Sequence, residues 1–460
     1  KVRTYLNLYY KTHCIKMGVL NNIKTELVIL LIITLYIFFS IDFDVGINNH
    51  LNNLKENHNI KYLFQFFSDI TELGDSLWYF GICMVGIILF FIIKKSKIID
   101  NKISQKYINF FFTSFIYLLV VGVITQFFKH LIGRPRPNHL DLDNSLEFYF
   151  FSFESNYHSF PSGHSSTIFM VGLILAAQFP RLKFFFYFLA TVIAVSRVVV
   201  GAHFFTDVIA GVLLSLIIFK FLNMRFGKKY MLDFHIVNII NKNRNIFEIL
   251  ICFLLLCLFV TVAPSLDLYL ASIFNIGGSQ FILQSFHILS IFFRKILLPG
   301  ILIYLLIFPI LSRVSIIKII FISYKFSIKE IFLIWFSQIF TVVIFVNLVL
   351  KNLWGRARPG DIIQFDGQDL YTPWYQISNI CETNCSFVSG DSSVGFSIII
   401  LFLITKKILF LYLSIFLGFS LGLIRMMAGG HFFSDVLFAG FFVIILNLII
   451  YQLYKKFYEN

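Results

Sequence analysis

The amino-acid sequence predicts an all-α polytopic membrane protein made of two tandem six-helix bundles, with about 12 transmembrane helices. Of its 460 residues, 58% are hydrophobic and only 13% are charged, which is about half the charged fraction of an ordinary globular chain. The apolar residues form long uncharged blocks, as helices that cross the hydrocarbon do. In addition, the second half of the chain repeats the first.

The uncharged blocks are the expected spans, six in each half. In the first half they lie near residues 25–41, 76–93, 107–128, 165–180, 184–202 and 208–224. In the second half they lie near residues 249–266, 296–312, 331–350, 392–405, 408–424 and 436–454. The uncharged stretch 268–293 is a further candidate, but Gly277 and Gly278 interrupt it. We therefore expect an interfacial or re-entrant segment there.

Three sequence blocks recur in the same order, which indicates an internal duplication. The pairs are "KHLIGRPRP" (129–137) with "KNLWGRARP" (351–359), "FPSGHSS" (160–166) with "FVSGDSS" (387–393), and "RVVVGAHFFTDVIAG" (197–211) with "RMMAGGHFFSDVLFAG" (425–440). The predicted segments are a cytoplasmic tail 1–24, a membrane domain 25–227, a cytoplasmic linker 228–245 and a second membrane domain 246–460.

The charges in the loops predict the orientation. Basic residues gather in the loops near 94–106, 313–329 and 406–407, whereas acidic residues outnumber basic ones in 42–75. By the positive-inside rule, both termini are then cytoplasmic and all three repeated blocks lie on the outer side. Arg294 and Lys295 are exceptions, because they lie near an outer end. The first apolar block begins near Leu27 behind a basic tail, so we expect a retained span and not a cleaved signal peptide.

Three cations recur at matched spacing in each half, on the side where Lys and Arg should be scarce. They are Lys129, Arg136 and Arg197 in the first half and Lys351, Arg358 and Arg425 in the second. A single cation at a membrane boundary is often a snorkelling anchor. Three convergent cations, two of them with planar guanidinium groups, suit a phosphate dianion better.

Two further patterns point to chemistry on a phosphate. Ser162, Gly163 and His164 precede an apolar helix. Ser is a common N-cap, and the free amides at a helix start also bind an oxyanion. His203 and Asp207 are four residues apart, so on a helix they would share a face. An Asp that holds one ring nitrogen leaves the other free as a nucleophile, whereas a single membrane His is more often a packing or polar-network residue.

Together, Lys-x6-Arg-Pro, Pro-Ser-Gly-His and Ser-Arg-x5-His-x3-Asp resemble the signature of the phosphatidic acid phosphatase type 2 superfamily. The resemblance covers most of both halves and implies six-helix phosphatase modules that need no metal or other cofactor. It implies that His203 attacks phosphorus, that Asp207 orients His203 and that His164 protonates the leaving alkoxide. It also implies that the phosphoryl oxygens are held by Lys129, Arg136, Arg197, Ser162 and Gly163.

The second half departs from this pattern at two positions. It keeps Lys351, Arg358, Ser389, Gly390, Arg425, His431 and Asp435. Ile424 replaces the Ser before Arg425, and Asp391 replaces the general-acid His. An ordinary Asp has a pKa of about 3.9 and would need one of about 7 to act as an acid near neutral pH. Nearby cations oppose such a rise and a bound phosphate dianion favours it. Three alternatives follow. Asp391 acts as an acid only in the substrate complex, or the leaving group needs less protonation to depart. In the third, the second half binds its ligand without catalysis.

The segment "YTPWYQISNICETNCSFVSGDSS" (371–393) is similar to the second motif of bacterial lipid A phosphatases of this superfamily, notably the 4′-phosphatase type. Cys381 and Cys385 lie in this outer segment and form either a disulfide, as an oxidising compartment allows, or two free thiols. The other cysteines lie in apolar blocks or in the tail, and those in the blocks are expected to be packing residues.

The expected function is that of a lipid phosphatase at the periplasmic face of a bacterial inner membrane, with lipid A as the leading substrate. Undecaprenyl pyrophosphate and phosphatidylglycerol phosphate are alternative substrates, and lipid phosphotransfer is an alternative reaction. A transporter is disfavoured, because carriers place charged sites near the bilayer midplane and here they lie at span ends. The net charge of +14 does not indicate nucleic-acid binding, because the basic residues lie in short loops between spans. The sequence leaves the oligomeric state open.

Overall fold

The computed structural model describes residues 41–55, 60–97, 99–139, 148–224, 244–284, 287–313 and 324–458. The predicted tail, the first predicted span near 25–41 and most of the predicted linker 228–245 lie outside these residues. The chain divides between Arg244 and Asn245 into two compact units.

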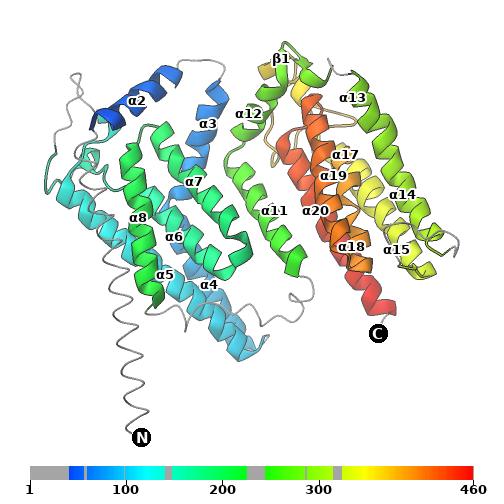
Figure 1. Ribbon diagram of the computed structural model, residues 1–460, viewed down its shortest axis with the longest axis horizontal. Helices are drawn as coiled ribbons and strands as arrows, with labels where there is room; N and C mark the ends of the chain where they lie inside the picture. Colours follow the sequence, from blue (N-terminus) through cyan, green and yellow to red (C-terminus); the bar gives the residue numbers. More distant parts are fainter. Residues whose placement is uncertain are drawn as a thin grey trace, which may run out of the picture. The chain divides into compact units, whose positions relative to one another are not determined.

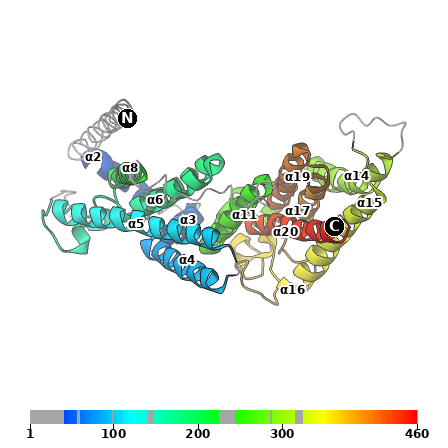
Figure 2. The same ribbon diagram turned by 90° about the horizontal axis from the view of Figure 1, so that it is seen from below.

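The first unit is a helix bundle with two small helices at one end (Figures 1 and 2). Its helices are α2 (Ile41–Lys55), α3 (Lys61–Ile70), α4 (Ser76–Ser96), α5 (Asn101–Ile132), α6 (Gly163–Gln178), α7 (Lys183–Val199) and α8 (Phe205–Leu222). Short 3-10 turns occupy Thr71–Gly74, Pro137–His139, Ser155–Tyr157 and Pro180–Leu182. The central helix is α6, which packs against α5, α7 and α8.

Local sequence accounts for the limits of these helices. Asp75 caps α4 by accepting a hydrogen bond from the Leu77 amide at 2.9 Å, and Lys94 and Lys95 lie in its last turn, where positive charge is favourable. Apolar side chains lie both in the core and on the outer surface of the bundle; Phe188, for example, is 64% exposed. An apolar side chain on the surface is expected of a membrane helix, because lipid tails are as apolar as the protein core.

The second unit repeats this arrangement with more irregular helices (Figure 1). Its helices are α11 (Arg244–Val262), α12 (Ser265–Phe274), α13 (His287–Ile291), α14 (Leu298–Leu311), α15 (Ile328–Gln338), α16 (Lys351–Trp354), α17 (Gly390–Phe396), α18 (Ile399–Thr405), α19 (Ile408–Met427) and α20 (Phe433–Tyr458). Two segments are π-helical: η9 (Phe292–Leu297) leads into α14, and η10 (Ile339–Leu350) joins α15 to α16. Short 3-10 turns occupy Ile282–Gln284, Pro359–Asp361 and Ile363–Phe365. The central helix is α17, which packs against α14, α19, α20 and η10.

The uncharged stretch 268–293 does not form one continuous helix. After α12 the chain makes a small antiparallel hairpin from β1 (Asn275–Gly277) and β2 (Gln280–Phe281). Gly277 and Gly278 have positive φ angles of 117° and 59°, which only glycine adopts without strain. The break that these two glycines predicted is therefore present, and the interfacial or re-entrant placement of the segment stays a prediction.

Within the described residues, nine helices are long and apolar enough to cross a membrane. Two more predicted spans correspond to shorter apolar helices, Gly163–Gln178 and Gly390–Thr405. The span predicted near 296–312 begins earlier, at Ile288. The prediction of an all-α polytopic membrane protein is confirmed.

Candidate active sites

The first site forms where α5 and α7 end and α6 and α8 begin. Lys129 lies in the last turn of α5, and Ser162 is the N-cap of α6. A Cβ atom placed on Gly163 would lie 3.5 Å from Lys129 Nζ, so the ammonium group reaches the start of α6. His164 follows directly and packs against Gly74, where an added Cβ would lie 2.8 Å from its ring. The predicted lysine, helix start and histidine therefore share one site.

The turn after the lysine depends on glycine in both halves. Gly133 and Gly355 have φ angles of 59° and 61°, in the left-handed region that ends many helices. An added Cβ would lie 1.6 Å from the Tyr149 carbonyl oxygen at Gly133 and 1.7 Å from that of Ser378 at Gly355. These turns direct the following Arg-x-Arg segment back towards the site.

The predicted His–Asp pair is close in space, but it does not share a helix face. The first residue of α8 is Phe205, so His203 precedes the helix and Asp207 lies in its first turn. His203 Nδ1 lies 3.8 Å from Asp207 Oδ2, and His431 Nδ1 lies 3.7 Å from Asp435 Oδ2. Both are ion-pair separations and too long for hydrogen bonds. The prediction of a shared helix face was wrong, because the chain turns at the helix start and the carboxylate caps it: Asp207 Oδ2 accepts the Phe204 amide at 2.9 Å.

The imidazole orientation is clearest in the second half. His431 Nδ1 lies 2.6 Å from the carbonyl oxygen of Ser386. A carbonyl can only accept, so Nδ1 carries the hydrogen and Nε2 is the nitrogen with a free lone pair. In the first half, His203 Nδ1 lies 3.5 Å from Ser159 Oγ, whose hydroxyl donates to Asp207 Oδ2 at 2.6 Å. The Asp thus orients the His partly through a serine that the motif analysis did not identify.

Burial lowers the basicity of both imidazole rings. His203 and His431 are each 2% exposed. Burial lowers the pKa of each to about 4, although the neighbouring Asp207 or Asp435 carboxylate favours the charged form. Each imidazole is therefore neutral near pH 7, which is the state that a nucleophile requires.

A buried arginine supports each of the two aspartates. Arg134 donates to Asp207 at 2.5 Å and to Asp44, on α2, at 2.8 Å. Arg356 donates to Asp435 at 2.6 Å and to Asp267, on α12, at 2.9 Å. All six side chains are at most 1% exposed. A hydroxyl completes each network: Thr206 accepts from Arg134 at 2.9 Å and Ser434 accepts from Arg356 at 2.7 Å.

None of the predicted site residues belongs to these networks except Asp207 and Asp435. Arg134 and Arg356 occupy the first arginine position of the repeated "GRPRP" and "GRARP" segments, so the duplication held a signal for them. Asp44 and Asp267 are 90 and 89 residues away from their arginines, and no local motif marks either.

The two predicted arginines of the first site have unused hydrogen-bonding capacity. In the part of the chain that the structure describes, the buried Nε atoms of Arg136 and Arg197 have no hydrogen-bond partner. Arg197 uses one other nitrogen to donate to Thr71 at 2.8 Å. The positive charges of Lys129, Arg136 and Arg197 all act on His164. Cations with open donors at a helix start form a site for an anion.

The second site is a cavity of about 630 Å³. Its lining includes Lys351, Arg358, Asp391, Arg425 and His431, five of the predicted residues, together with Ser279, Arg294, Gly360, Asp361, Asn384, Ala428, Gly429 and Gly430. The four cations and two carboxylates in this lining leave a net charge of +2, which matches the charge of about −2 on a phosphate monoester. Ser389 caps α17, and a Cβ on Gly390 would lie 3.3 Å from Lys351 Nζ. The predicted residues of the second half therefore also converge.

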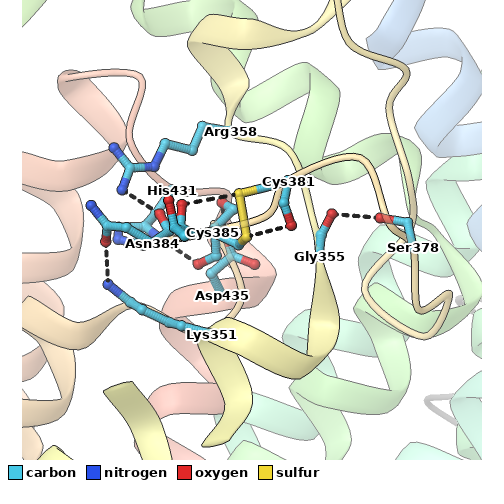
Figure 3. Close-up of a disulfide and its surroundings, with 11 residues drawn as sticks. Lys351, Gly355, Arg358, Ser378, Cys381, Asn384, Cys385, His431 and Asp435 are labelled. Atoms are coloured by element: carbon cyan, nitrogen blue, oxygen red, sulfur yellow. Dashed lines mark hydrogen bonds and ion pairs between the residues drawn. A yellow bond between two sulfur atoms is a disulfide. The ribbon is translucent and has the colours of Figure 1, made fainter. Parts of the chain in front are cut away.

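A disulfide between Cys381 and Cys385 closes a small loop beside the second site (Figure 3). Figure 3 shows Lys351 and Arg358 approaching Asn384 within this loop. Lys351 Nζ donates to Asn384 Oδ1 at 3.2 Å, and Arg358 donates to the Asn384 carbonyl oxygen at 2.6 Å. The disulfide is one of the two alternatives left open by the sequence. It closes the loop whose Asn384 contacts two of the cations predicted to bind phosphate.

No group of three or more His, Cys, Asp or Glu side chains is placed to hold a metal ion among the residues that the structure describes. The other described cysteines, Cys83, Cys252 and Cys257, are free thiols in helices and are buried or half-buried.

The chain is similar to several known proteins. The sequence model of the PAP2 superfamily matches residues 110–230 and 332–459. A lipid A 4′-phosphatase of Francisella tularensis subsp. novicida is 34% identical over 226 residues, which cover 46% of this chain and 96% of that protein. A lipid A 1-phosphatase of Rhizobium johnstonii is 35% identical over 148 residues, covering 31% of this chain and 59% of that protein. A PAP2-type phosphatidylglycerolphosphate phosphatase from Bacillus subtilis, known from its crystal structure, aligns over 45% of this chain and 96% of its own, with 22% identity and a TM-score of 0.34.

Proposed function

Because the chain belongs to the PAP2 superfamily, we propose that it is a membrane lipid phosphatase with two active sites, each working through a phosphohistidine. The observation that carries the proposal is the orientation of His431. Its Nδ1 is engaged by the Ser386 carbonyl, and the ring lines a cavity that also contains Lys351, Arg358 and Arg425. A neutral imidazole with one free nitrogen among three cations suits nucleophilic attack on a phosphate ester.

In the first site, His203 Nε2 attacks phosphorus and the bond from phosphorus to the leaving oxygen breaks. His164, which packs on Gly74 at the start of α6, donates the proton that the leaving alkoxide needs. Lys129, Arg136, Arg197 and the amides at Ser162 and Gly163 bind the phosphoryl oxygens. Water then attacks the phosphohistidine and releases inorganic phosphate. Asp207 and its buried arginine stabilise the imidazolium character of His203 as the N–P bond forms.

In the second site, His431 attacks, Asp435 supports it, and the phosphoryl oxygens are bound by Lys351, Arg358, Arg425, Ser389 and Gly390. The second site keeps the predicted nucleophile, its Asp and the predicted phosphate-binding residues, whereas Asp391 replaces the acid and Ile424 replaces the Ser before Arg425.

The proposed location is a bacterial inner membrane, with both sites at the periplasmic face and both termini in the cytoplasm. The distribution of Lys and Arg between loops supports this orientation. The disulfide Cys381–Cys385 also supports it, because disulfides persist in the periplasm and are rare in the cytosol. A reporter enzyme fused after Asn460 should be active only on the cytoplasmic side; activity on the outer side would refute the orientation.

The proposed substrate is lipid A. Two of the relatives are named lipid A 4′-phosphatase and lipid A 1-phosphatase, and two sites in one chain fit a lipid with two phosphates. The test is mass spectrometry of lipid A from cells that express the wild type, His203→Ala or His431→Ala. Each single variant should restore one phosphate, at a different position, and the double variant should restore both.

Three outcomes would change this proposal in different ways. If the double variant still removes phosphate, the histidines are not the nucleophiles. If one single variant has no effect, that half binds without catalysis. If lipid A is never altered although the purified protein releases phosphate from other lipid phosphates, the reaction stands and the substrate is wrong.

A further inference from the structure

Arg294 is a cation of the second site that belongs to none of the repeated motifs. It lies on η9, the segment that leads into α14. Together with Lys351, Arg358, Arg425 and His431, it lines the 630 Å³ cavity. Its position is also an exception to the positive-inside rule, since it lies near a predicted outer end, where Lys and Arg should be scarce. A role at the site gives this exception a reason.

The contact that Arg294 makes is with the residue that replaces the general acid. Arg294 Nε lies 3.7 Å from Asp391 Oδ2, and Arg425 Nε lies 3.5 Å from the same oxygen. Asp391 is the second residue of α17, after the N-cap Ser389 and Gly390. His164 has the same place in α6. Both distances are ion-pair separations, so two guanidinium groups flank the Asp391 carboxylate.

The first site has no cation at the corresponding segment. There the chain before α4 is the 3-10 turn Thr71–Gly74, whose Gly74 packs on His164. Its one charged residue is Glu72, whose negative charge acts on Arg197. The change from His to Asp in the second site is therefore accompanied by a cation from the neighbouring segment.

The Arg294–Asp391 pair is poorly placed to stabilise the fold. The Arg294 side chain is 55% exposed and that of Asp391 is 25% exposed, and ion pairs this open contribute little to stability. By contrast, the buried pairs of Arg356 are at most 1% exposed. The open pair faces the cavity in which the substrate phosphate would bind, so its charge is available to the reaction.

We infer that Arg294 is a catalytic residue of the second site, where its guanidinium group stabilises the negative charge on the leaving oxygen while Asp391 holds it in place. The inference rests on the proposed phosphatase function. His431 Nε2 gives its lone pair to phosphorus, and the bond from phosphorus to the leaving oxygen breaks with its electrons on that oxygen. Arg294 donates a hydrogen bond to the oxyanion, which takes its proton from water. A second water molecule then attacks phosphorus and gives a proton to the hydroxide left by the first, the N–P bond breaks with its electrons on Nε2, and inorganic phosphate leaves.

The test compares two leaving groups in a chain with one working site. In the His203→Ala background only the second site is active, and phosphate release is measured from 4-nitrophenyl phosphate and from a long-chain alkyl phosphate in detergent. An aryloxide leaves easily, whereas an alkoxide needs much more stabilisation. Arg294→Ala should lower kcat/KM about 10²-fold for the alkyl ester and less than about tenfold for the aryl ester. Arg294→Lys should recover part of the alkyl rate, because it restores a cation.

Two controls make the result specific. Lys295→Ala removes the neighbouring exposed cation and should change both rates by less than about twofold. Arg294→Ala in the His431→Ala background should leave the activity of the first site intact, which shows that the chain still folds.

Equal losses with the two esters would overturn the inference, because Arg294 would then only bind phosphoryl oxygens. No loss with either ester would place Arg294 outside the reaction altogether. If the His203→Ala parent and the His431→Ala parent both release no phosphate from any ester, the proposed function itself fails.

Discussion

The two halves agree around the proposed nucleophile, His203 or His431, and differ where the proposed general acid lies in the first half. Arg134 holds Asp207 at 2.5 Å and Arg356 holds Asp435 at 2.6 Å. On the other side, His164 packs on a glycine, whereas Asp391 pairs with arginines. A buried ionic network tolerates little change, because losing one partner leaves an unpaired charge in the interior. By contrast, a residue that lines an open cavity can be replaced by one of another type when a neighbouring segment supplies a side chain that pairs with the replacement.

The largest effect is expected from replacing the buried arginine that supports the Asp in each half, Arg134 or Arg356. Arg134→Met and Arg356→Met should each lower the stability of the folded state by about 3–5 kcal/mol, because each leaves two carboxylates buried without their cation. Thermal unfolding in detergent would show the loss, and phosphate release should fail at the site in the same half. Arg136→Met is the matched control: it removes a half-buried cation of the site and should reduce activity with much less loss of stability. Wild-type stability in both buried variants would show that the networks are not essential.

A smaller effect is expected from the disulfide, which the first half lacks at this place. Replacing Cys381 and Cys385 by Ser should lower the kcat/KM of the second site about tenfold, because Asn384 would no longer hold Lys351 and Arg358 in position. The measurement uses the His203→Ala background. In the His431→Ala background the same replacement should leave the first site unchanged. An equal loss at both sites would indicate a general folding defect.

The smallest difference between the two sites is expected in the pH dependence of their activity, because the two proposed nucleophiles are equally buried. Burial lowers the pKa of His203 and of His431 to about 4. Each imidazole therefore stays neutral as the pH falls below the ordinary value of about 6.5, and its nucleophilicity is lost only as the pH falls through about 4. Profiles of kcat/KM for an aryl phosphate, recorded on each single-site variant and corrected for the second ionisation of the substrate phosphate near pH 6, should be flat from pH 7 to about pH 5. An acid limb centred near pH 6.5 at either site would contradict the lowered pKa of its histidine.

The amino-acid sequence by itself determined the membrane class and the duplication, and it predicted the principal site residues. Uncharged blocks of about 20 residues have few alternatives to transmembrane helices. Lys129, His164 and His203 belong to short motifs whose residues are close in the chain, and the helix ends on which they lie are set by local caps and glycines. Repetition then placed the same residues in the second half.

Only the tertiary structure decided which distant residues complete the sites. Asp44 binds Arg134 although the two are 90 residues apart in the sequence. Arg294 pairs with Asp391 although the two lie in different segments of the second half. The geometry of the His–Asp pair was also decided there, because it depends on where α8 begins. Charged residues in loops have no periodicity that marks their partners, and the packing of the helices brings them together.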